Sequence, residues 1–364
     1  MKKHLLTLAI ALLPSFQAHA DIAIGFAAPL TGQYAVLGEQ AHHGYEQAIA
    51  DINAQGGVLG QKLVAVEADD ACDPKIAVAV ANQMVSKGVK FIVGHLCSGA
   101  SIPTSKIYNE EGIFMISPSS TNPALTDSGL SNVFRVCGRD DEQGKVQAHY
   151  VLRRFPGAKI AILHDNSTGG KGQAEQFKKT INEAGIHEVM FESYMTGQRD
   201  YSALIAKIKN LGVQVLDIGG FHTEVGLIAR QLKEQGAHVQ IMGGDALVTD
   251  EFWSITGPAG EGVLMTFSPD PRNRPEVKPI LDELRKPGFE PEGYTLYAYA
   301  AMQVIAEGIR RAGVTDPMKV AHLVHRPEIK TVLGPLTFND KGDVSGSTYV
   351  VYRWHDGKYT EIRD

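Results

Sequence analysis

From residue 22 onward, short runs of apolar and β-branched residues alternate with longer stretches whose apolar residues recur at helical spacing. The short runs are typical of buried strands, and the longer stretches are typical of helices packed through one face. This alternation predicts parallel sheets covered by helices on both faces. The clearest helix follows Asp73, a typical N-cap, and has Pro74 at its first position. We expect it to end at Gly88 and to bury Ile76, Val80 and Met84.

The alternation occurs in two series, which predicts an α/β protein with two similar, doubly wound lobes. The length of 364 residues agrees, because it exceeds what one hydrophobic core usually organises. Strands of the first series are predicted at 22–27, 63–68, 91–93 and 114–116. The second series begins after Cys137, with strands at 159–163, 189–192, 213–218 and 239–242 and helices from 141 and at 172–184, 201–211 and 224–235. Helices at 276–286, 294–312 and 317–325 are assigned to the first lobe, and short strands and hairpins to 331–362.

The amino terminus has the pattern of a secretory signal peptide. Residues 1–20 contain two lysines, an apolar stretch at 5–13 and a small-residue end at Ala20, after which we expect cleavage. The stretch is shorter than the roughly 20 residues that span a bilayer. Later apolar runs have the length of strands, so we expect an exported protein that does not span the membrane.

The charge balance excludes one class of partner. The chain has 35 basic and 41 acidic residues, and loss of Lys2 and Lys3 with the signal peptide leaves 33 − 41 = −8. Since no cluster of Lys and Arg offers a footprint for a phosphate backbone, nucleic-acid binding is not expected.

Export permits disulfide bonds, and the chain has three cysteines. Cys72 and Cys97 each lie just past the carboxyl end of a predicted strand. Neighbouring parallel strands bring such ends together, so we expect these two cysteines to form a disulfide. Cys137 lies in the strand-like segment 133–138 and is expected to be a buried free thiol.

In open parallel sheets, ligands bind outside the carboxyl ends of the strands. Glycine and small hydroxyl residues are frequent in the loops at these ends. Hydroxyls and backbone N–H groups at helix starts suit a carboxylate, and a lone acid such as Asp245 suits an ammonium group. The alternative is that each Ser or Thr only caps a helix. The loops that predict a site for a zwitterion are 31–38, 95–101, 117–122, 165–170, 219–224 and 243–250.

Motifs for catalysis, phosphate binding and metal binding were not found. The sequence has no GxSxG, GxxxxGK[ST], HExxH or CxxC motif. His42 and His43 are adjacent, so they diverge on a helix and cannot chelate one ion. A hydrolase would need Ser98 as nucleophile with His95, which precedes it in the same loop. We therefore expect no enzyme activity, no cofactor and no metal.

Several segments closely resemble the periplasmic branched-chain amino acid binding proteins of ABC transporters, the leucine/isoleucine/valine type. The resemblance covers nearly all of the mature chain. Its most specific blocks are DINAQGGVLG and DDACDPKIAVAVANQMV. The segments that carry the resemblance are 51–60, 69–85, 93–101, 110–123, 160–165, 219–222, 334–343 and 352–357.

The resemblance implies a type I periplasmic binding protein fold, with two lobes joined by a three-segment hinge. Lobe 1 would comprise 21–139 and 267–346, and lobe 2 would comprise 140–266 and 347–364. It also implies a periplasmic monomer that closes on a branched-chain amino acid and delivers it to an inner-membrane permease. In such proteins the disulfide that matches Cys72 and Cys97 lies beside the pocket.

The resemblance also implies a set of ligand-binding residues. The ligand's carboxylate and ammonium groups would be held by positions matching Ser98, Ser119 and Thr121, where the middle residue acts mainly through its backbone. Phe221 and Asp245 would complete the site from across the cleft. Three further positions would surround the ligand's side chain: Leu37, Gly169 and Tyr294.

Four of these positions depart from the family pattern, which usually has Tyr at 221, Glu at 245, Tyr or Trp at 37 and Tyr at 169. Loss of the hydroxyl at Phe221 removes a carboxylate contact, and Asp245 withdraws the anion by one methylene. Leu37 and Gly169 enlarge or reshape the side-chain pocket. Other readings therefore include a binding protein for Ala, Pro, γ-aminobutyrate or an aromatic amino acid, and a periplasmic sensory module.

Overall fold

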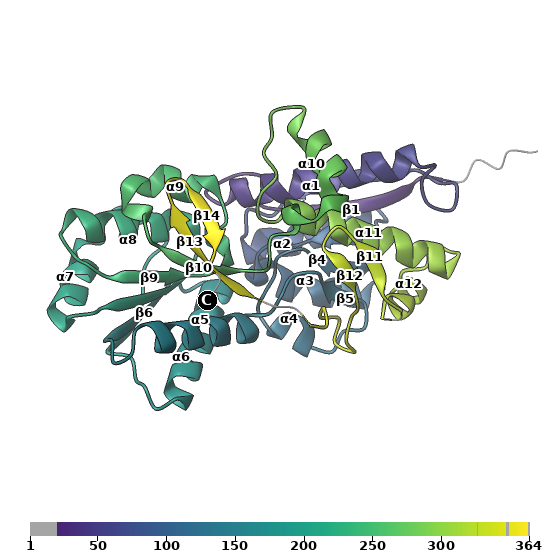
Figure 1. The fold of residues 1–364 in the computed structure, drawn as a ribbon. Helices are drawn as coiled ribbons and strands as arrows, with labels where there is room; N and C mark the ends of the chain where they lie inside the picture. Colours follow the sequence, from purple (N-terminus) through teal and green to yellow (C-terminus); the bar gives the residue numbers. More distant parts are fainter. Residues whose placement is uncertain (1–19, 326, 347–348, 363–364) are drawn as a thin grey trace, which may run out of the picture.

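The computed structural model describes residues 20–325, 327–346 and 349–362. The predicted signal peptide lies outside these residues except for Ala20. The described chain forms two halves that lie side by side, each built around its own sheet (Figure 1).

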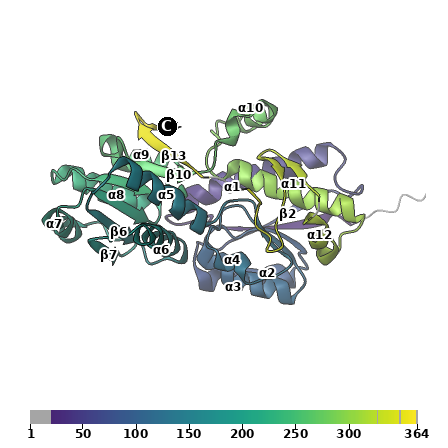
Figure 2. The ribbon, with the colours of Figure 1, turned by 60° about the horizontal axis from the view of Figure 1, so that its bottom comes forward.

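The first sheet has five parallel strands in the order β2-β1-β3-β4-β5. Helices α1 and α11 cover one face, and α2 and α3 cover the other (Figure 2). Strand residues alternate between these faces, as Phe91 and Ile92 show in β3. The strands are β1 (Ile22–Ala28), β2 (Leu63–Asp69), β3 (Phe91–Gly94), β4 (Phe114–Ser117) and β5 (Val133–Arg135). The helices are α1 (Ala35–Ala54), α2 (Pro74–Ser86), α3 (Ser98–Glu110), α4 (Ala124–Asp127), α11 (Thr295–Ala312) and α12 (Pro317–Val324).

The second sheet has seven strands in the order β14-β13-β10-β9-β8-β6-β7. Strand β13 pairs antiparallel with both β10 and β14, and the other pairs are parallel. Helices α5 and α6 cover one face, and α7, α8 and α9 cover the other. The strands are β6 (Ile160–His164), β7 (Met190–Ser193), β8 (Val215–Gly219), β9 (Gln240–Gly243), β10 (Leu264–Phe267), β13 (Val350–His355) and β14 (Lys358–Glu361). The helices are α5 (Asp140–Arg154), α6 (Thr168–Glu183), α7 (Ser202–Leu211), α8 (His222–Glu234) and α9 (Asp250–Thr256).

The chain passes between the two halves three times. The passages lie between β5 and β6, between β10 and α11, and between β12 and β13. Helix α10 (Lys278–Arg285) stands out from the body along the second passage (Figures 1 and 2). The hairpin β11 (Ile329–Thr331) and β12 (Gly334–Leu336) precedes the third. The predicted α/β class with two lobes is confirmed, while the lobe boundaries stay a prediction.

Local features of the predicted helices are mostly confirmed. The Asp73 carboxylate accepts hydrogen bonds from the N–H groups of Lys75 and Ile76, as an N-cap does. Ile76 is 45% exposed, so its assignment to the buried face was wrong, although Val80 and Met84 are buried. Helix α6 begins at Thr168, four residues before the predicted start, because Ser167 caps it.

The disulfide between Cys72 and Cys97 is present, with Cα atoms 5.4 Å apart. The reason given for it was partly wrong, because β1 lies between β2 and β3 and the bond spans the end of this central strand. Cys137 is buried and free, as predicted, and burial raises the pKa of its thiol to about 12. It lies beyond the end of β5, on the first passage between the halves.

Among the described residues, no helix is both long enough and apolar enough to cross a bilayer.

Candidate functional site

A cavity of about 400 Å³ lies where the carboxyl ends of the two parallel sheets meet. The helices α1, α3, α5, α6, α8 and α11 all begin at it. A helix start presents unpaired N–H groups and the positive end of the helix dipole. The cavity lining includes every ligand-binding residue predicted from the sequence: Leu37, Ser98, Ser119, Thr121, Gly169, Phe221, Asp245 and Tyr294.

The Ser98 side offers hydrogen-bond donors. The Ser98 Oγ accepts a hydrogen bond from the Asn122 N–H at 3.2 Å, which leaves its own proton free to donate. Ser98 and Gly99 begin α3, so their N–H groups have no partner within the helix. These donors suit a carboxylate.

Ser119 and Thr121 are each held by a hydrogen bond within the protein. The Ser119 hydroxyl donates to the carbonyl oxygen of Leu96 at 2.9 Å, which is consistent with a residue that acts through its backbone. The Thr121 carbonyl oxygen accepts a hydrogen bond from the backbone N–H of Asp140 at 3.0 Å, which ties this residue to the start of α5.

The opposite side of the cavity is acidic. Asp245 accepts hydrogen bonds from the Tyr294 hydroxyl and from Gln143 Nε2, the latter at 3.2 Å. Burial raises the pKa of Asp245. Burial also raises the pKa of Asp140 to about 7, and the charge of Asp245 adds to this shift. Asp165 also lines the cavity, and no Lys, Arg or His among the described residues does so. Carboxylates without a cation suit an ammonium group.

The remaining walls are apolar or carry no side chain. The rings of Tyr34 and Phe221 meet across the cavity, with centroids 4.2 Å apart. A Cβ on Gly169 would have Ser98 Oγ, 4.0 Å away, as its only neighbour within 4 Å. A Cβ on Gly170, by contrast, would lie 2.3 Å from Asp165 Oδ1. The fold therefore requires a glycine at 170, whereas Gly169 leaves open room in the cavity.

The hydrolase alternative is not supported by the position of His95. Its Nδ1 lies 2.6 Å from Asp70 Oδ2, and its Nε2 lies 3.0 Å from the Tyr108 hydroxyl. Both ring nitrogens are thus occupied by buried partners, so this ring is not placed to take a proton from Ser98.

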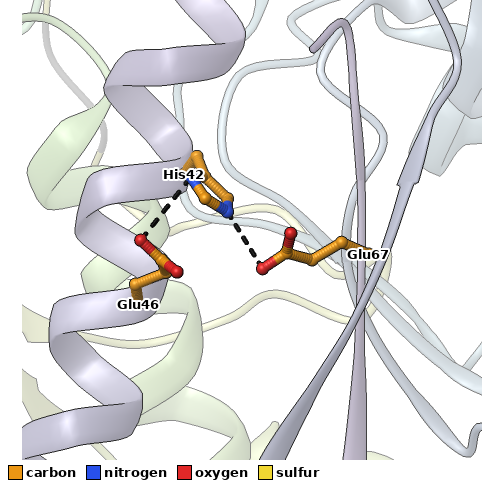
Figure 3. A group of neighbouring side chains, drawn as sticks. All are labelled: His42, Glu46 and Glu67. Carbon is orange, nitrogen blue, oxygen red and sulfur yellow. Dashed lines mark ion pairs between the residues drawn. The ribbon is translucent and has the colours of Figure 1, made fainter.

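Outside the cavity, His42 lies between Glu46 and Glu67 (Figure 3). Its Nδ1 is 3.7 Å from Glu46 Oε2, and its Nε2 is 2.9 Å from Glu67 Oε1. The two carboxylates thus approach different ring nitrogens, whereas an imidazole ligand binds a metal ion through one of them. The arrangement fits an ion pair that joins α1 to β2.

Residues 21–358 match the family described as periplasmic binding protein. The chain belongs to this family. This periplasmic binding protein is 47% identical over 350 residues to Leu/Ile/Val-binding protein homolog 1 of Brucella suis biovar 1, covering 95% of this chain and 94% of the relative. It is 44% identical over 367 residues to an amino acid binding protein of Pseudomonas aeruginosa, covering 99% and 98%.

Solved structures of similar fold belong to the same group. A leucine binding protein, LivK, of Thermotoga maritima has a TM-score of 0.87 at 26% identity, covering 94% of this periplasmic binding protein and 98% of that chain. The branched-chain amino acid transporter substrate binding protein LivJ of Streptococcus pneumoniae, in complex with isoleucine, has a TM-score of 0.85 at 26% identity, covering 94% and 99%.

Tyr34, Asp140 and Asp165 of this periplasmic binding protein line the cavity with polar groups and were not predicted as ligand contacts. Tyr34 and Asp165 lie inside two of the predicted loops, so their positions were available from the sequence. Asp140 was outside all six loops, because it begins a helix that follows a passage between the halves instead of a strand of the same sheet.

Proposed function

We propose that this protein captures a branched-chain amino acid in the periplasm by closing its two halves, and delivers it to the permease of an ABC transporter. The observation that carries the proposal is the division of the cavity lining. Hydroxyl and N–H donors lie at Ser98, carboxylates lie at Asp245 and Asp140, and apolar walls complete the enclosure. A small zwitterion with an apolar side chain matches this division. The relatives named for leucine, isoleucine and valine support the same ligand class.

Closure follows if the ligand contacts both halves, since a ligand shifts an equilibrium only through contacts that differ between the two states. Ser98 belongs to the first half and Asp245 to the second, so one amino acid would bridge them. The halves also make direct contacts at the cavity. Tyr294 donates to Asp245, and Asn122 Nδ2 donates to the Thr168 carbonyl oxygen at 2.9 Å.

The groups in the cavity can account for a micromolar affinity. A micromolar dissociation constant corresponds to about −8 kcal/mol. Burial of one aliphatic side chain contributes roughly 1.5–3 kcal/mol. Hydrogen bonds to the two charged ends contribute about 1.5–3 kcal/mol each, and the lost freedom of the ligand offsets part of the sum.

Titration calorimetry of the mature protein with L-leucine, L-isoleucine and L-valine tests the ligand class. Alanine, proline, γ-aminobutyrate and phenylalanine serve as comparisons. We expect the three branched-chain amino acids to bind with dissociation constants of micromolar or below and to raise the melting temperature of the protein. If none of the amino acids binds, the proposal is wrong.

Uptake of radiolabelled leucine by cells that lack this protein tests the role in transport. We expect uptake to fall at low external concentration and to recover when the wild-type gene is restored. Undiminished uptake, together with leucine binding by the purified protein, would instead indicate a sensory role.

A further inference from the structure

Arg135 is a fully buried arginine beside the cavity. It ends β5, it is 0% exposed, and it does not itself line the cavity. Its Nη1 donates a hydrogen bond to the carbonyl oxygen of Ser120, and its Nη2 donates to that of Asn122 at 2.9 Å. These two residues flank Thr121, which does line the cavity. A buried guanidinium is costly unless it is paired and hydrogen-bonded, so its partners indicate what this side chain does.

The guanidinium is also held by the chain between β12 and β13. Arg135 Nε lies 2.8 Å from Oδ1 of Asp343, which is 3% exposed. The Thr126 hydroxyl accepts from Arg135 Nη2 at 2.8 Å and donates to Asp343 Oδ1 at 2.7 Å. Gly342 lets this chain approach β5, because its φ is +92° and a Cβ there would lie 2.1 Å from the Val133 carbonyl oxygen. The charge of Arg135 is thus balanced and its orientation is fixed.

The contact with Ser120 sets the direction of the next N–H group. The peptide bond between Ser120 and Thr121 is trans, and in a trans peptide the C=O and N–H groups point in opposite directions. Since the Ser120 carbonyl points at Arg135, the Thr121 N–H points away from it. This N–H has no hydrogen-bond partner in the described part of the chain. Because Thr121 lines the cavity and Arg135 does not, the loop presents a free donor on the cavity side.

The next peptide group orients Ser98 in the same way. The Thr121 carbonyl oxygen accepts from the Asp140 N–H at 3.0 Å, and the Asn122 N–H on the opposite side donates to Ser98 Oγ at 3.2 Å. Arg135 fixes Asn122 through its carbonyl, so it also fixes the group that leaves the Ser98 proton free to donate. The Ser98 hydroxyl and the Thr121 N–H are then two donors for the two oxygens of a carboxylate.

We propose that Arg135 is a positioning residue for the ligand's carboxylate, because it holds two loop carbonyls and so aims the Thr121 N–H and the Ser98 hydroxyl at that group. The inference rests on the proposed function, since it assumes that an amino acid occupies this cavity. Arg135 acts through the planar fork of its guanidinium, because its charge is balanced by Asp343. A lysine would keep the charge, but its single ammonium group does not reproduce the fork.

The test compares L-leucine with isopentylamine, which is leucine without its carboxylate. Calorimetry measures leucine affinity directly, and displacement of leucine measures the affinity for the amine. Both are determined for the wild type, Arg135→Lys and the matched control Arg139→Lys. Arg139 belongs to the same cluster, with Nη1 3.0 Å from Asp343 Oδ2, but its guanidinium contacts side chains and neither of the two loop carbonyls. Circular dichroism and thermal unfolding establish that each variant is folded.

We expect Arg135→Lys to lower leucine affinity at least about tenfold, as the loss of one hydrogen bond to a charged group does. The affinity for isopentylamine should change less than about threefold, so the preference for leucine narrows. Arg139→Lys should lower the melting temperature but keep the preference. A loss of stability alone affects both ligands alike, so the preference separates positioning from stability.

A spectroscopic measurement reports on the Thr121 N–H itself. The protein is prepared with isotope-labelled threonine, and the Thr121 amide signal is assigned by its absence in Thr121→Ser. Saturation with leucine should move the Thr121 amide proton of the wild type downfield, as a hydrogen bond to a carboxylate does. Isopentylamine should leave it near its ligand-free position. In Arg135→Lys the shift on leucine saturation should be clearly smaller.

An unchanged preference in a folded Arg135→Lys variant would overturn the inference, and so would an equal narrowing in Arg139→Lys or a Thr121 amide that leucine does not move. Should Arg135→Lys not fold, Asp343→Asn takes its place, because it weakens the hold on Arg135 Nε. It should narrow the preference at least about threefold, and a wild-type preference would again overturn the inference. Failure of the proposed function is distinguishable, because the wild type would then bind no amino acid.

Discussion

Replacement of Asp245 by Asn tests the electrostatic basis of the site most directly. Asn has nearly the same shape and keeps an oxygen for the hydrogen bond from Gln143 Nε2. It removes the negative charge and the second acceptor, which receives the Tyr294 hydroxyl. The cavity would then offer less negative charge to the ligand's ammonium group. In the wild type, no described Lys, Arg or His lines the cavity and could neutralise that charge in place of the ligand.

Loss of one partner of a buried, hydrogen-bonded charge pair costs about 2–5 kcal/mol. Asp140 remains nearby and still attracts the ammonium, so we expect a value toward the lower end, about 3 kcal/mol. Since every 1.4 kcal/mol is roughly a factor of ten, leucine affinity should fall about a hundredfold.

Calorimetry at neutral pH and low salt measures this change, and Asp282→Asn is the control. Asp282 lies on α10, is exposed, and pairs with Lys278 at 2.7 Å away from the cavity lining, so its replacement should leave leucine affinity unchanged. Tyr294→Phe should have a smaller effect than Asp245→Asn because it leaves the charge in place. If Asp245→Asn binds leucine within threefold of the wild type, the carboxylate does not hold the ammonium and the reasoning is wrong.

Three further changes have defined outcomes. Asp140 and Glu292 each have a pKa raised to about 7 by burial, so the folded ligand-free protein binds more protons than the unfolded chain between about pH 4 and 7. Its melting temperature should therefore fall as pH rises through this window, whereas leucine affinity should rise; two flat profiles would contradict this. Gly169→Val should leave the melting temperature nearly unchanged, and by calorimetry it should weaken leucine binding more than alanine binding. Equal losses of affinity for the two amino acids would show that Gly169 does not provide the space for the ligand's side chain. Serine at both Cys72 and Cys97 should lower the free energy of unfolding by about 2–4 kcal/mol in denaturant titrations and weaken leucine binding, because Ser98 follows directly; wild-type values would refute this.

Much of the fold, and the loops that line the cavity, followed from local patterns in the sequence, whereas the individual ligand-binding residues were taken from the family resemblance and stay a prediction. The alternation of strands and helices predicted two lobes, and the rule that ligands bind at the carboxyl ends of strands selected the loops of Ser98, Thr121 and Asp245. The pairing of Cys72 with Cys97 was right, but the order of strands was not, since nothing local places β1 between β2 and β3.

Local sequence patterns could not predict which polar groups of the site donate hydrogen bonds and which accept them. Whether a hydroxyl donates or accepts depends on partners remote in the chain, such as the Leu96 carbonyl for Ser119 and the Asn122 N–H for Ser98. Asp140 was missed for a related reason. Its place at the cavity depends on where the first passage between the halves enters the second sheet, and this is set by the packing of the two halves.

The position of β13 and β14 at the edge of the second sheet also bears on how the molecule is completed during synthesis. These strands come last in the chain, and they bring Trp354, which is fully buried and packs on Phe252 and Trp253 of α9. The first half likewise needs α11 to complete its core, and in the sequence this helix comes after nearly all of the second half. Neither hydrophobic core can close until these late segments have been synthesised, so a nascent chain that contains all the earlier elements of a half still lacks part of that half's packing.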